Sequence, residues 1–332
     1  MINQKVFIVL VNYKGWKDTI ECLESVFKLS HKSFQVIVVD NSPTHDSIYQ
    51  IESWALGTSH KKVPTLHKRI VYPLQPKPIK FKIISQKESE SNFYDEALLI
   101  IKAQENRGFS AANNIGLRYA QRRNDFEYCW ILNNDTVVDK NSLHNQINEL
   151  KRRKDKRIGI LGSKLVEYYS PKKIQAIGGS FNKAMFTSKH IGSGAPIASP
   201  KTMFKKIDYV IGASMLVNKK FLDDVGLMNE AYFLYYEEID WTYRAKEKKW
   251  KIDWCENSFV YHKEGASAGS SMRAKTKSKK SDIISFESRK NFFKTTKGNQ
   301  TLFACSSILM VVNRLRRFQF KTAYMFCKIL IK

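Results

Sequence analysis

Cysteine, glycine and proline are scarce in this sequence, and each scarcity excludes a class of protein. The five cysteines are odd in number and include no Cys-x-x-Cys pair, which argues against a disulfide framework or a structural zinc site and favours a reducing cytosol. With 15 glycines, 8 prolines and 43% hydrophobic residues among 332, the composition is neither collagen-like nor that of a disordered chain. A globular fold with a sizeable core is expected.

Long uncharged apolar runs are also lacking. The run at residues 6–11 is shorter than the apolar region of a signal peptide and is predicted to be a first buried strand. The run at 302–312 contains two serines and is closed by Arg314, so it does not reach the roughly 18 apolar residues of a spanning helix. We therefore expect a chain that does not cross a membrane.

Acidic residues are few beside basic ones. The chain has 31 Asp and Glu against 56 Lys and Arg, a formal charge of +25, and about half of the excess lies in residues 263–332. Such a charge attracts phosphate backbones without specificity. Because the sequence has no zinc finger, RNP-like aromatic motif or basic-region heptad, we expect no specific nucleic-acid partner.

Short β-branched runs alternate with helical patterns along the first 135 residues. The predicted strands are 6–11, 36–39, 98–101 and 128–132. This alternation predicts an α/β fold with a mostly parallel central sheet flanked by helices. Because ligand-binding loops of such sheets lie at the carboxyl ends of the strands, Asn12-Tyr13 and Asp40-Asn41 are expected on one edge.

We predict two parts of the chain. Residues 1–265 form the α/β domain, with an insertion at 57–95 that is rich in proline and lysine at its start. Mixed strand candidates lie at 158–164 and 207–217. Residues 266–332 form a basic helical C-terminal extension, and the lysine-rich run 275–280 near its start is expected to be a solvated loop.

Two features could bind a metal, and each also has a purely structural interpretation. Asn133-Asn134-Asp135 follows an apolar strand, where acceptor oxygens could meet a divalent cation and a diphosphate, but Asn and Asp are also ordinary turn residues. His262 ends another apolar strand and could be a metal ligand or a structural hydrogen-bonding residue. One His with one Asp would leave coordination positions open for diphosphate oxygens.

A third feature is a group of carboxylates at a predicted helix start, Glu237, Glu238 and Asp240. Acids favour the positive end of the helix dipole, and Asp240 can pair with Arg244 one turn further on. Alternatively, adjacent like charges beneath an aromatic-rich run raise the pKa of one carboxylate and make it a usable general base.

Taken in order, these features resemble the motifs of family 2 glycosyltransferases. Asn133-Asn134-Asp135 resembles the DXD motif of the family, the segment 233–240 with Arg244 resembles its ED motif, and His262 resembles its late metal-binding histidine. The resemblance covers residues 4–265 and is most similar to the rhamnosyltransferase and galactofuranosyltransferase branch. The matching segments are 11–13, 38–42, 105–116, 132–136, 233–240 and 260–262.

The resemblance implies an inverting transferase of the GT-A fold that uses a nucleotide-sugar donor. The implied cofactor is Mg²⁺ or Mn²⁺, held by Asp135 and His262, which offsets the charge of the departing nucleoside diphosphate. Glu238 is the implied general base towards the acceptor hydroxyl, with Asp240 as the reserve candidate. The residues implied to bind the nucleotide are Asn12, Tyr13, Asp40, Asn41, Asn106, Arg107 and Asn134.

Two residues depart from the family pattern. Asn133 stands where the DXD motif begins with Asp, which removes one anionic oxygen and leaves Asp135 as the only carboxylate of the motif. Glu238 stands in place of Asp, so the carboxylate lies one methylene further from the backbone. The first change bears on metal affinity and the second on the position of the base.

The segment 301–332 mixes apolar and basic residues at helical spacing. Such helices either lie on an anionic membrane surface or pack on the catalytic domain with a basic edge in solvent. Attachment to the inner face of the cytoplasmic membrane would bring a cytoplasmic enzyme to a polyprenyl-linked saccharide acceptor. The family resemblance implies a role in building a surface polysaccharide.

The donor and several rival functions stay open at this point. The first expectation is transfer of L-rhamnose from dTDP-rhamnose, and the second is a UDP-sugar that donates a galactofuranosyl or hexosyl group. A degenerate transferase that only binds a nucleotide or nucleic acid is a further alternative. A sugar-activating nucleotidyltransferase is disfavoured because the sequence lacks a glycine-rich phosphate loop near its N-terminus and any G-x-x-x-x-G-K-[ST] segment.

Overall fold

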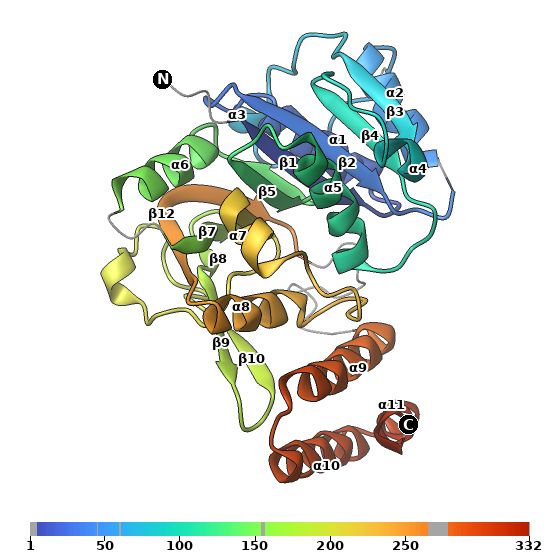
Figure 1. Ribbon diagram of the computed structural model, residues 1–332, viewed down its shortest axis with the longest axis vertical. Helices are drawn as coiled ribbons and strands as arrows, with labels where there is room; N and C mark the ends of the chain where they lie inside the picture. The colour runs from blue at the N-terminus through green and yellow to red at the C-terminus, as the bar shows by residue number, and fades with distance from the viewer. Residues whose placement is uncertain (1–4, 45, 60, 154–156, 265–277, 332) are drawn as a thin grey trace.

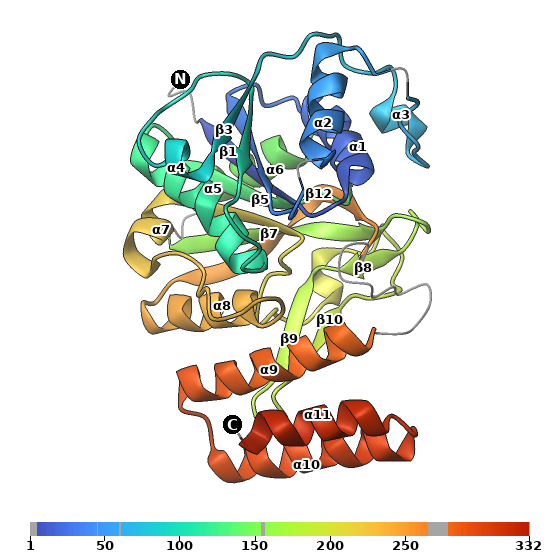
Figure 2. The same ribbon diagram turned by 90° about the vertical axis from the view of Figure 1, so that its right-hand side faces the viewer.

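One large twisted sheet organises the protein, and its strand order sets where the functional loops meet. The computed structural model describes residues 5–44, 46–59, 61–153, 157–264 and 278–331 (Figures 1 and 2). Within them the strands follow the order β3-β4-β2-β1-β5-β11-β7-β12-β6, with β8 beside β7. The strands are β1 (Val6–Asn12), β2 (Phe34–Asp40), β3 (Phe81–Ser85), β4 (Leu98–Lys102), β5 (Tyr128–Asn133), β6 (Thr136–Val138), β7 (Ile158–Glu167), β8 (Ile174–Ala176), β11 (Ser214–Asn218) and β12 (Lys251–His262).

The first half of the sheet is parallel, and antiparallel strands enter in the second half. β1 pairs parallel with β2 and β5, and β4 pairs parallel with β2 and β3. β11 runs antiparallel to both β5 and β7, while β7 and β12 are parallel. A separate hairpin consists of β9 (Gly178–Asn182) and β10 (Thr187–Ile191). The predicted α/β fold with a mostly parallel sheet is confirmed.

Helices cover both faces of the sheet, as the unbroken apolar strands require. Side chains alternate along β1, so that Ile8 and Leu10 pack against α1, α2 and α6, whereas Phe7 packs against α5. Figure 1 shows this layered arrangement. The helices are α1 (Trp16–Val26), α2 (Asp46–Leu56), α3 (Lys68–Val71), α4 (Gln86–Ser89), α5 (Phe109–Arg123), α6 (Ser142–Arg152), α7 (Lys219–Val225), α8 (Glu237–Glu247), α9 (Lys279–Thr296), α10 (Gln300–Arg316), α11 (Phe320–Ile331) and a 3-10 turn at Lys201–Met203.

Three local predictions differ from the structure. The segment 57–95, predicted as an insertion, includes the edge strand β3 and helix α4, because the apolar run that starts at Phe81 pairs with β4. The strand predicted over 207–217 begins only at Ser214. Lys279 and Lys280 start α9, where the Ser278 side chain caps the helix by accepting from the Ser281 amide, whereas 275–277 lie outside the described residues.

The C-terminal region is helical, as predicted. α9 packs on the α/β domain through the buried Phe292, and Figure 2 shows it lying between α8 and the pair formed by α10 and α11. The predicted domain boundary at 265/266 lies outside the described residues. Across the parts of the chain described above, no helix combines the length and apolar character needed to cross a membrane.

Candidate active site

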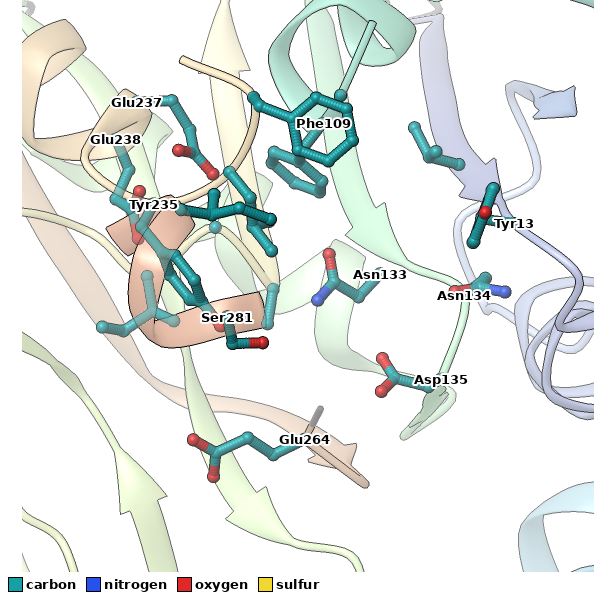
Figure 3. A pocket seen from close by; sticks show the side chains of 18 of the residues that line it. Tyr13, Phe109, Asn133, Asn134, Asp135, Tyr235, Glu237, Glu238, Glu264 and Ser281 are labelled. Atoms are coloured by element: carbon teal, nitrogen blue, oxygen red, sulfur yellow. The ribbon is translucent and has the colours of Figure 1, made fainter. Parts of the chain in front are cut away.

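A pocket of about 350 Å³ opens where the parallel strands end. The ends of β1, β2 and β5, the loop 106–109, the start of α8, the end of β12 and the first turns of α9 supply its walls (Figure 3). Its position matches the edge expected of a parallel sheet. The sequence-predicted residues that line it are Tyr13, Asn41, Asn106, Asn134, Asp135, Glu238 and His262.

One wall carries the predicted metal pair. Asp135 Oδ1 lies 3.2 Å from His262 Nε2, and both side chains are buried. His262 Nδ1 lies 2.8 Å from Gln175 Oε1, and the Gln175 amide nitrogen donates to Glu264 at 2.9 Å. Because Gln175 thereby presents its oxygen to the ring, Nδ1 carries the proton and the Nε2 position faces Asp135.

This arrangement calls for a positive charge between Asp135 and His262. Without one, an imidazole lone pair and a carboxylate oxygen face each other. A proton on Nε2 satisfies the pair: burial lowers the pKa of His262, but Asp135 raises it above the ordinary value overall. A divalent cation satisfies it equally, since two ligand atoms about 2.1 Å from one ion and at right angles are about 3.0 Å apart. The donor set therefore fits Mg²⁺ or Mn²⁺.

Among the described residues, no third His, Cys, Asp or Glu joins Asp135 and His262 to form a metal-binding group. No group of three or more His, Cys, Asp or Glu side chains in them could hold a metal. Two protein ligands leave several coordination positions of a divalent ion open, which diphosphate oxygens or water would fill.

The opposite wall carries two adjacent carboxylates. Glu237 and Glu238 both line the pocket, across from Asn133 and Asp135 (Figure 3). Each has one buried carboxylate oxygen without a hydrogen-bond partner. Burial raises the pKa of Glu238 to about 7, and burial together with the neighbouring Glu238 charge raises the pKa of Glu237 well above its ordinary value. At neutral pH this pair can hold a proton and also accept one.

A strained turn presents these carboxylates. Tyr235 and Tyr236, the two residues before α8, both have positive φ, at 72° and 69°. Left-handed backbone at a bulky residue costs roughly 1–2 kcal/mol, so two in succession need support from packing. Tyr236 is buried against Phe292 of α9 and donates its hydroxyl to the carbonyl of Phe186. The C-terminal extension thus helps to hold the turn.

Asn12 and Asp40 do not line the pocket but tie its loops together. Both are buried, and Asp40 Oδ1 accepts from the Asn12 amide at 2.6 Å and from the Ser42 hydroxyl at 2.8 Å. Asn12 Oδ1 in turn accepts from Thr19, whose hydroxyl accepts from Asn134 at 2.9 Å. This chain of hydrogen bonds couples the first strand to the DXD-like turn.

The loop after β4 is fixed by a glycine. Asn106 Oδ1 accepts from the Asn41 side chain at 2.8 Å and from the Gly108 amide at 3.0 Å. Gly108 has φ 94°, and a Cβ there would lie 2.1 Å from the carbonyl oxygen of Phe233. The Phe109 amide donates to that same carbonyl at 2.8 Å. Only glycine lets this loop meet the segment that leads into α8.

Two further predicted residues lie outside the pocket lining. The Asp240 carboxylate accepts from Arg244 Nε at 2.9 Å and from the Tyr232 hydroxyl at 3.3 Å, which is the structural pairing considered above. Arg107 is exposed and lies 3.5 Å from Glu230. Of the two predicted bases, Glu238 lines the pocket and Asp240 does not.

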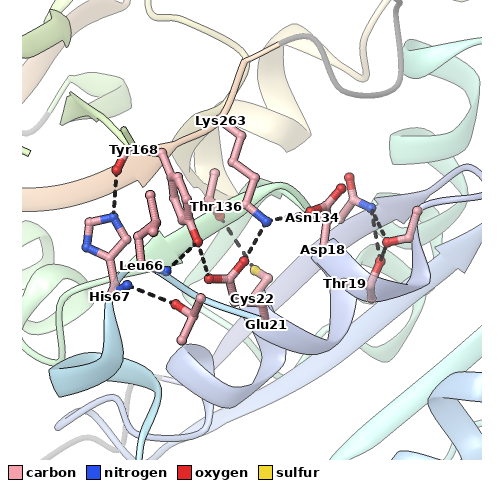
Figure 4. Close-up of polar contacts among 12 residues, drawn as sticks. Asp18, Thr19, Glu21, Cys22, Leu66, His67, Asn134, Thr136, Tyr168 and Lys263 are labelled. Atoms are coloured by element: carbon pink, nitrogen blue, oxygen red, sulfur yellow. Dashed lines mark hydrogen bonds and ion pairs between the residues drawn. The ribbon is translucent and has the colours of Figure 1, made fainter. Parts of the chain in front are cut away.

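A polar network lies behind the pocket wall that carries Asp135 and His262 (Figure 4). Lys263, next to His262, donates to Asp18 and Glu21, each at 2.5 Å, and its backbone amide donates to the carbonyl of Asp135. Burial lowers the pKa of Lys263, but these carboxylates raise it above the ordinary value overall. Glu21 also accepts from the Tyr168 hydroxyl at 2.6 Å, so α1 and the end of β12 hold their relative positions.

Sequence reasoning missed several pocket residues. Gln175 could have been noticed as a polar residue within a short apolar strand candidate, although nothing in the sequence links it to His262. Lys280, Ser281 and Ile284 of α9 line the pocket, yet no local signal connects them with residues 100 or more positions earlier.

Part of the chain is similar to a known protein family and to a curated protein. Residues 82–226 match the family model described as glycosyl transferase family 2. These 145 residues are similar to that family and make up less than half of the chain. A curated relative, the low-salt glycan biosynthesis hexosyltransferase Agl10 of Haloferax volcanii, is 27% identical over 165 residues, which is 48% of this chain. The aligned part spans 50% of the length of that relative.

Solved structures support the GT-A fold. GalNAc-T7 with UDP, GalNAc and Mn²⁺ has a TM-score of 0.53 at 14% identity, over 78% of this chain and 44% of that chain. The mannosyltransferase PcManGT from Pyrobaculum calidifontis in complex with GDP-Man and Mn²⁺ has a TM-score of 0.51 at 13% identity, over 98% of this chain and 74% of that chain. At these identities the likeness concerns the fold alone.

Proposed function

We propose that this chain is a glycosyltransferase that moves a hexose from a nucleotide-sugar to a hydroxyl of a saccharide. The observation that carries the proposal is the pair of opposed walls in one pocket: Asp135 with His262 on one side and the half-buried Glu238 on the other. The names of the relatives agree, since one is a hexosyltransferase and the two solved structures hold UDP or GDP-Man with Mn²⁺.

In this proposal Glu238 is the general base. Its carboxylate takes the proton of the acceptor hydroxyl while that oxygen forms a bond to the anomeric carbon. The bond from this carbon to the diphosphate breaks on the opposite face, and the nucleoside diphosphate leaves with the electron pair. The anomeric configuration is therefore inverted. Asp135 and His262 would hold Mg²⁺ or Mn²⁺, which would supply positive charge to the leaving diphosphate.

The residues predicted to bind the nucleotide fall into two groups, those that line the pocket and those that hold its loops in place. Tyr13, Asn41, Asn106 and Asn134 line the pocket and are proposed to contact the nucleotide. Asn12 and Asp40 are proposed to act through the loops that they hold, while the exposed Arg107 is proposed to reach the nucleotide from the pocket rim.

The finer identity of the substrates follows the sequence resemblance. The proposed donor is dTDP-L-rhamnose, with a UDP-hexose or UDP-galactofuranose as the second choice. The proposed acceptor is a polyprenyl-linked saccharide of a growing surface polysaccharide, and the proposed location is the cytoplasm. The shape of the pocket decides which donor sugar is chosen, because a difference of one methylene group changes affinity by about 1–3 kcal/mol.

Ligand binding tests the nucleotide assignment. Thermal shift of the purified chain is measured with dTDP, UDP, GDP and CDP, each with and without Mn²⁺, because a ligand of the native state raises the melting temperature. A Mn²⁺-dependent shift with one nucleotide is expected. No shift with any nucleotide contradicts the proposal and leaves the degenerate or nucleic-acid-binding alternative.

Transfer assays test the base. Glu238→Gln should abolish sugar transfer while the nucleotide-induced shift survives. Glu247→Gln, an exposed glutamate at the end of the same helix, is the matched control and should transfer normally. Full transfer by Glu238→Gln removes Glu238 from the role.

A further inference from the structure

The last two helices expose an apolar surface that packing within the chain does not explain. We call it the α10–α11 outer face. Its side chains are between 44% and 82% exposed, although most exposed positions of a soluble helix are polar. They are Ile308, Leu309, Val312, Leu315, Phe318 and Phe320.

The buried side of α10 makes the contrast sharper. The residues that α10 buries are Phe303, Ser306 and Ser307. The two serines contact the guanidinium group of Arg289 on α9, and the Ser307 hydroxyl accepts from Arg289 Nη1 at 2.8 Å. The central part of this helix therefore turns serines inward and Ile308 and Leu309 outward, the reverse of the usual distribution.

Charge identifies what covers this face. Residues 300–331 contain five basic residues and no Asp or Glu. Arg316, Arg317, Lys321 and Lys328 are exposed beside the apolar side chains. A second copy docked by two-fold symmetry would bring these like charges together without an acid from either α10 or α11 to pair them. An anionic lipid surface meets both properties, because acyl chains take the apolar side chains and headgroups the basic ones.

We propose that the α10–α11 outer face docks on an anionic membrane surface, with both helices lying in the interface. Contacts through α9 join the docking surface to the pocket. Phe326 of α11 stacks on Phe286 of α9 with ring centroids 4.0 Å apart, and Arg314 of α10 pairs with Asp282 of α9 through both carboxylate oxygens. The first turns of α9 in turn line the pocket through Lys280, Ser281 and Ile284.

A membrane-bound outer face therefore holds the pocket beside the bilayer. This consequence, which suits an acceptor carried on a lipid, rests on the proposed function. The docking itself does not, because it involves neither nucleotide nor metal.

Vesicle binding of the full chain, without donor or metal, tests the proposal. The probe is a vesicle of phosphatidylcholine and phosphatidylglycerol in about a 2:1 ratio, compared with pure phosphatidylcholine. Binding is expected to the anionic vesicles at about 0.05 M NaCl and to weaken at about 0.5 M NaCl, because salt screens the basic residues. Failure to bind anionic vesicles at low salt overturns the docking, whatever the nucleotide experiments show.

Matched substitutions separate the apolar contribution to vesicle binding from the electrostatic contribution. Leu309→Gln is expected to weaken partitioning about tenfold, and its control is Leu56→Gln on α2, where the leucine is 48% exposed. Arg316→Gln with Arg317→Gln is expected to weaken it about thirtyfold. The control for this pair is Lys151→Gln with Arg152→Gln on α6, which removes the same charge from an exposed site.

Folding and self-association are measured alongside. Substitutions at these exposed positions should leave the melting temperature nearly unchanged, so loss of binding cannot be ascribed to unfolding. Equal partitioning of the outer-face variants and their controls overturns the proposal. So does sedimentation of the native chain as a dimer that Leu309→Gln converts to a monomer, because the face is then an interface between copies.

Discussion

The pH dependence of transfer should follow the ionisation of Glu238. Burial raises the pKa of this carboxyl group to about 7, so its base form is half populated near neutral pH. The rate constant kcat, measured with saturating donor, acceptor and metal, should fall about tenfold for each pH unit below this value. The same shift makes Glu238 favour the folded state while protonated, a contribution present below its ordinary pKa and lost as the pH rises through about 7.

The size of the effect distinguishes a buried base from an ordinary one. With a pKa of about 7, kcat at pH 5 should be about a hundredth of its plateau value. A glutamate with the ordinary pKa of about 4.3 would lose only about a fifth of its activity at pH 5. A flat profile down to pH 5 would therefore refute the assignment.

Variants of the neighbouring carboxylate sharpen the assay. Burial raises the pKa of Glu238, and burial together with the Glu238 charge raises the pKa of Glu237, so the shift at Glu238 does not depend on a charge at Glu237. Glu237→Gln should thus keep the acid limb near pH 7 and retain transfer, whereas Glu238→Gln should lose it. Nucleotide and Mn²⁺ binding, followed by thermal shift at every pH, separates protonation of His262 from protonation of the base. Loss of transfer in Glu237→Gln with activity in Glu238→Gln would exchange the two roles.

Three further outcomes follow from the contacts in the pocket. Gln175→Leu should weaken Mn²⁺ binding by about tenfold or more, measured by isothermal titration with nucleotide present, because the ring of His262 loses the acceptor that fixes its tautomer. Asn133→Asp should tighten Mn²⁺ binding in the same titration, since it puts an anionic oxygen in place of the amide nitrogen that lies 3.3 Å from His262 Nε2, and unchanged affinity would place this side chain outside the metal site. Gly108→Ala should lower the urea-unfolding free energy by about 2 kcal/mol or more, because its Cβ would meet the Phe233 carbonyl, and a smaller loss would mean that the loop shifts freely.

The sequence was informative where structure is local. The β-branched run that starts at Val6 predicts β1, and the helical spacing of apolar residues after Trp16 predicts α1. Both predictions succeed because each pattern is formed by residues only a few positions apart in the sequence. The position of β11 could not be predicted in this way. It lies between β5 and β7 and pairs antiparallel to both, so its register depends on partners 50 or more residues away.

The sequence predicted the motif residues but could not separate those that line the pocket from those that hold its loops. Asn12 and Asp40 belong to segments that resemble nucleotide-binding motifs, yet their side chains are buried and bond to each other. The sequence shows that polar residues end neighbouring strands. It does not show which of them turns inward, because that depends on the strand twist and on partners such as Thr19 in the following helix α1.

The effect of Asn133 on metal binding depends on the contacts of its side chain, which the motif alone does not show. The sequence shows that an anionic oxygen is missing, which by itself argues for weaker metal binding. In the structure the Asn133 amide lies 3.3 Å from His262 Nε2, the same nitrogen that faces Asp135. Because Gln175 holds the proton on the other ring nitrogen, the Asn133 amide can donate to this lone pair when neither a second proton nor a cation occupies Nε2. The amide therefore competes with the metal for one nitrogen, and a diphosphate that brings its own charge and oxygens is what would shift that competition towards the ion.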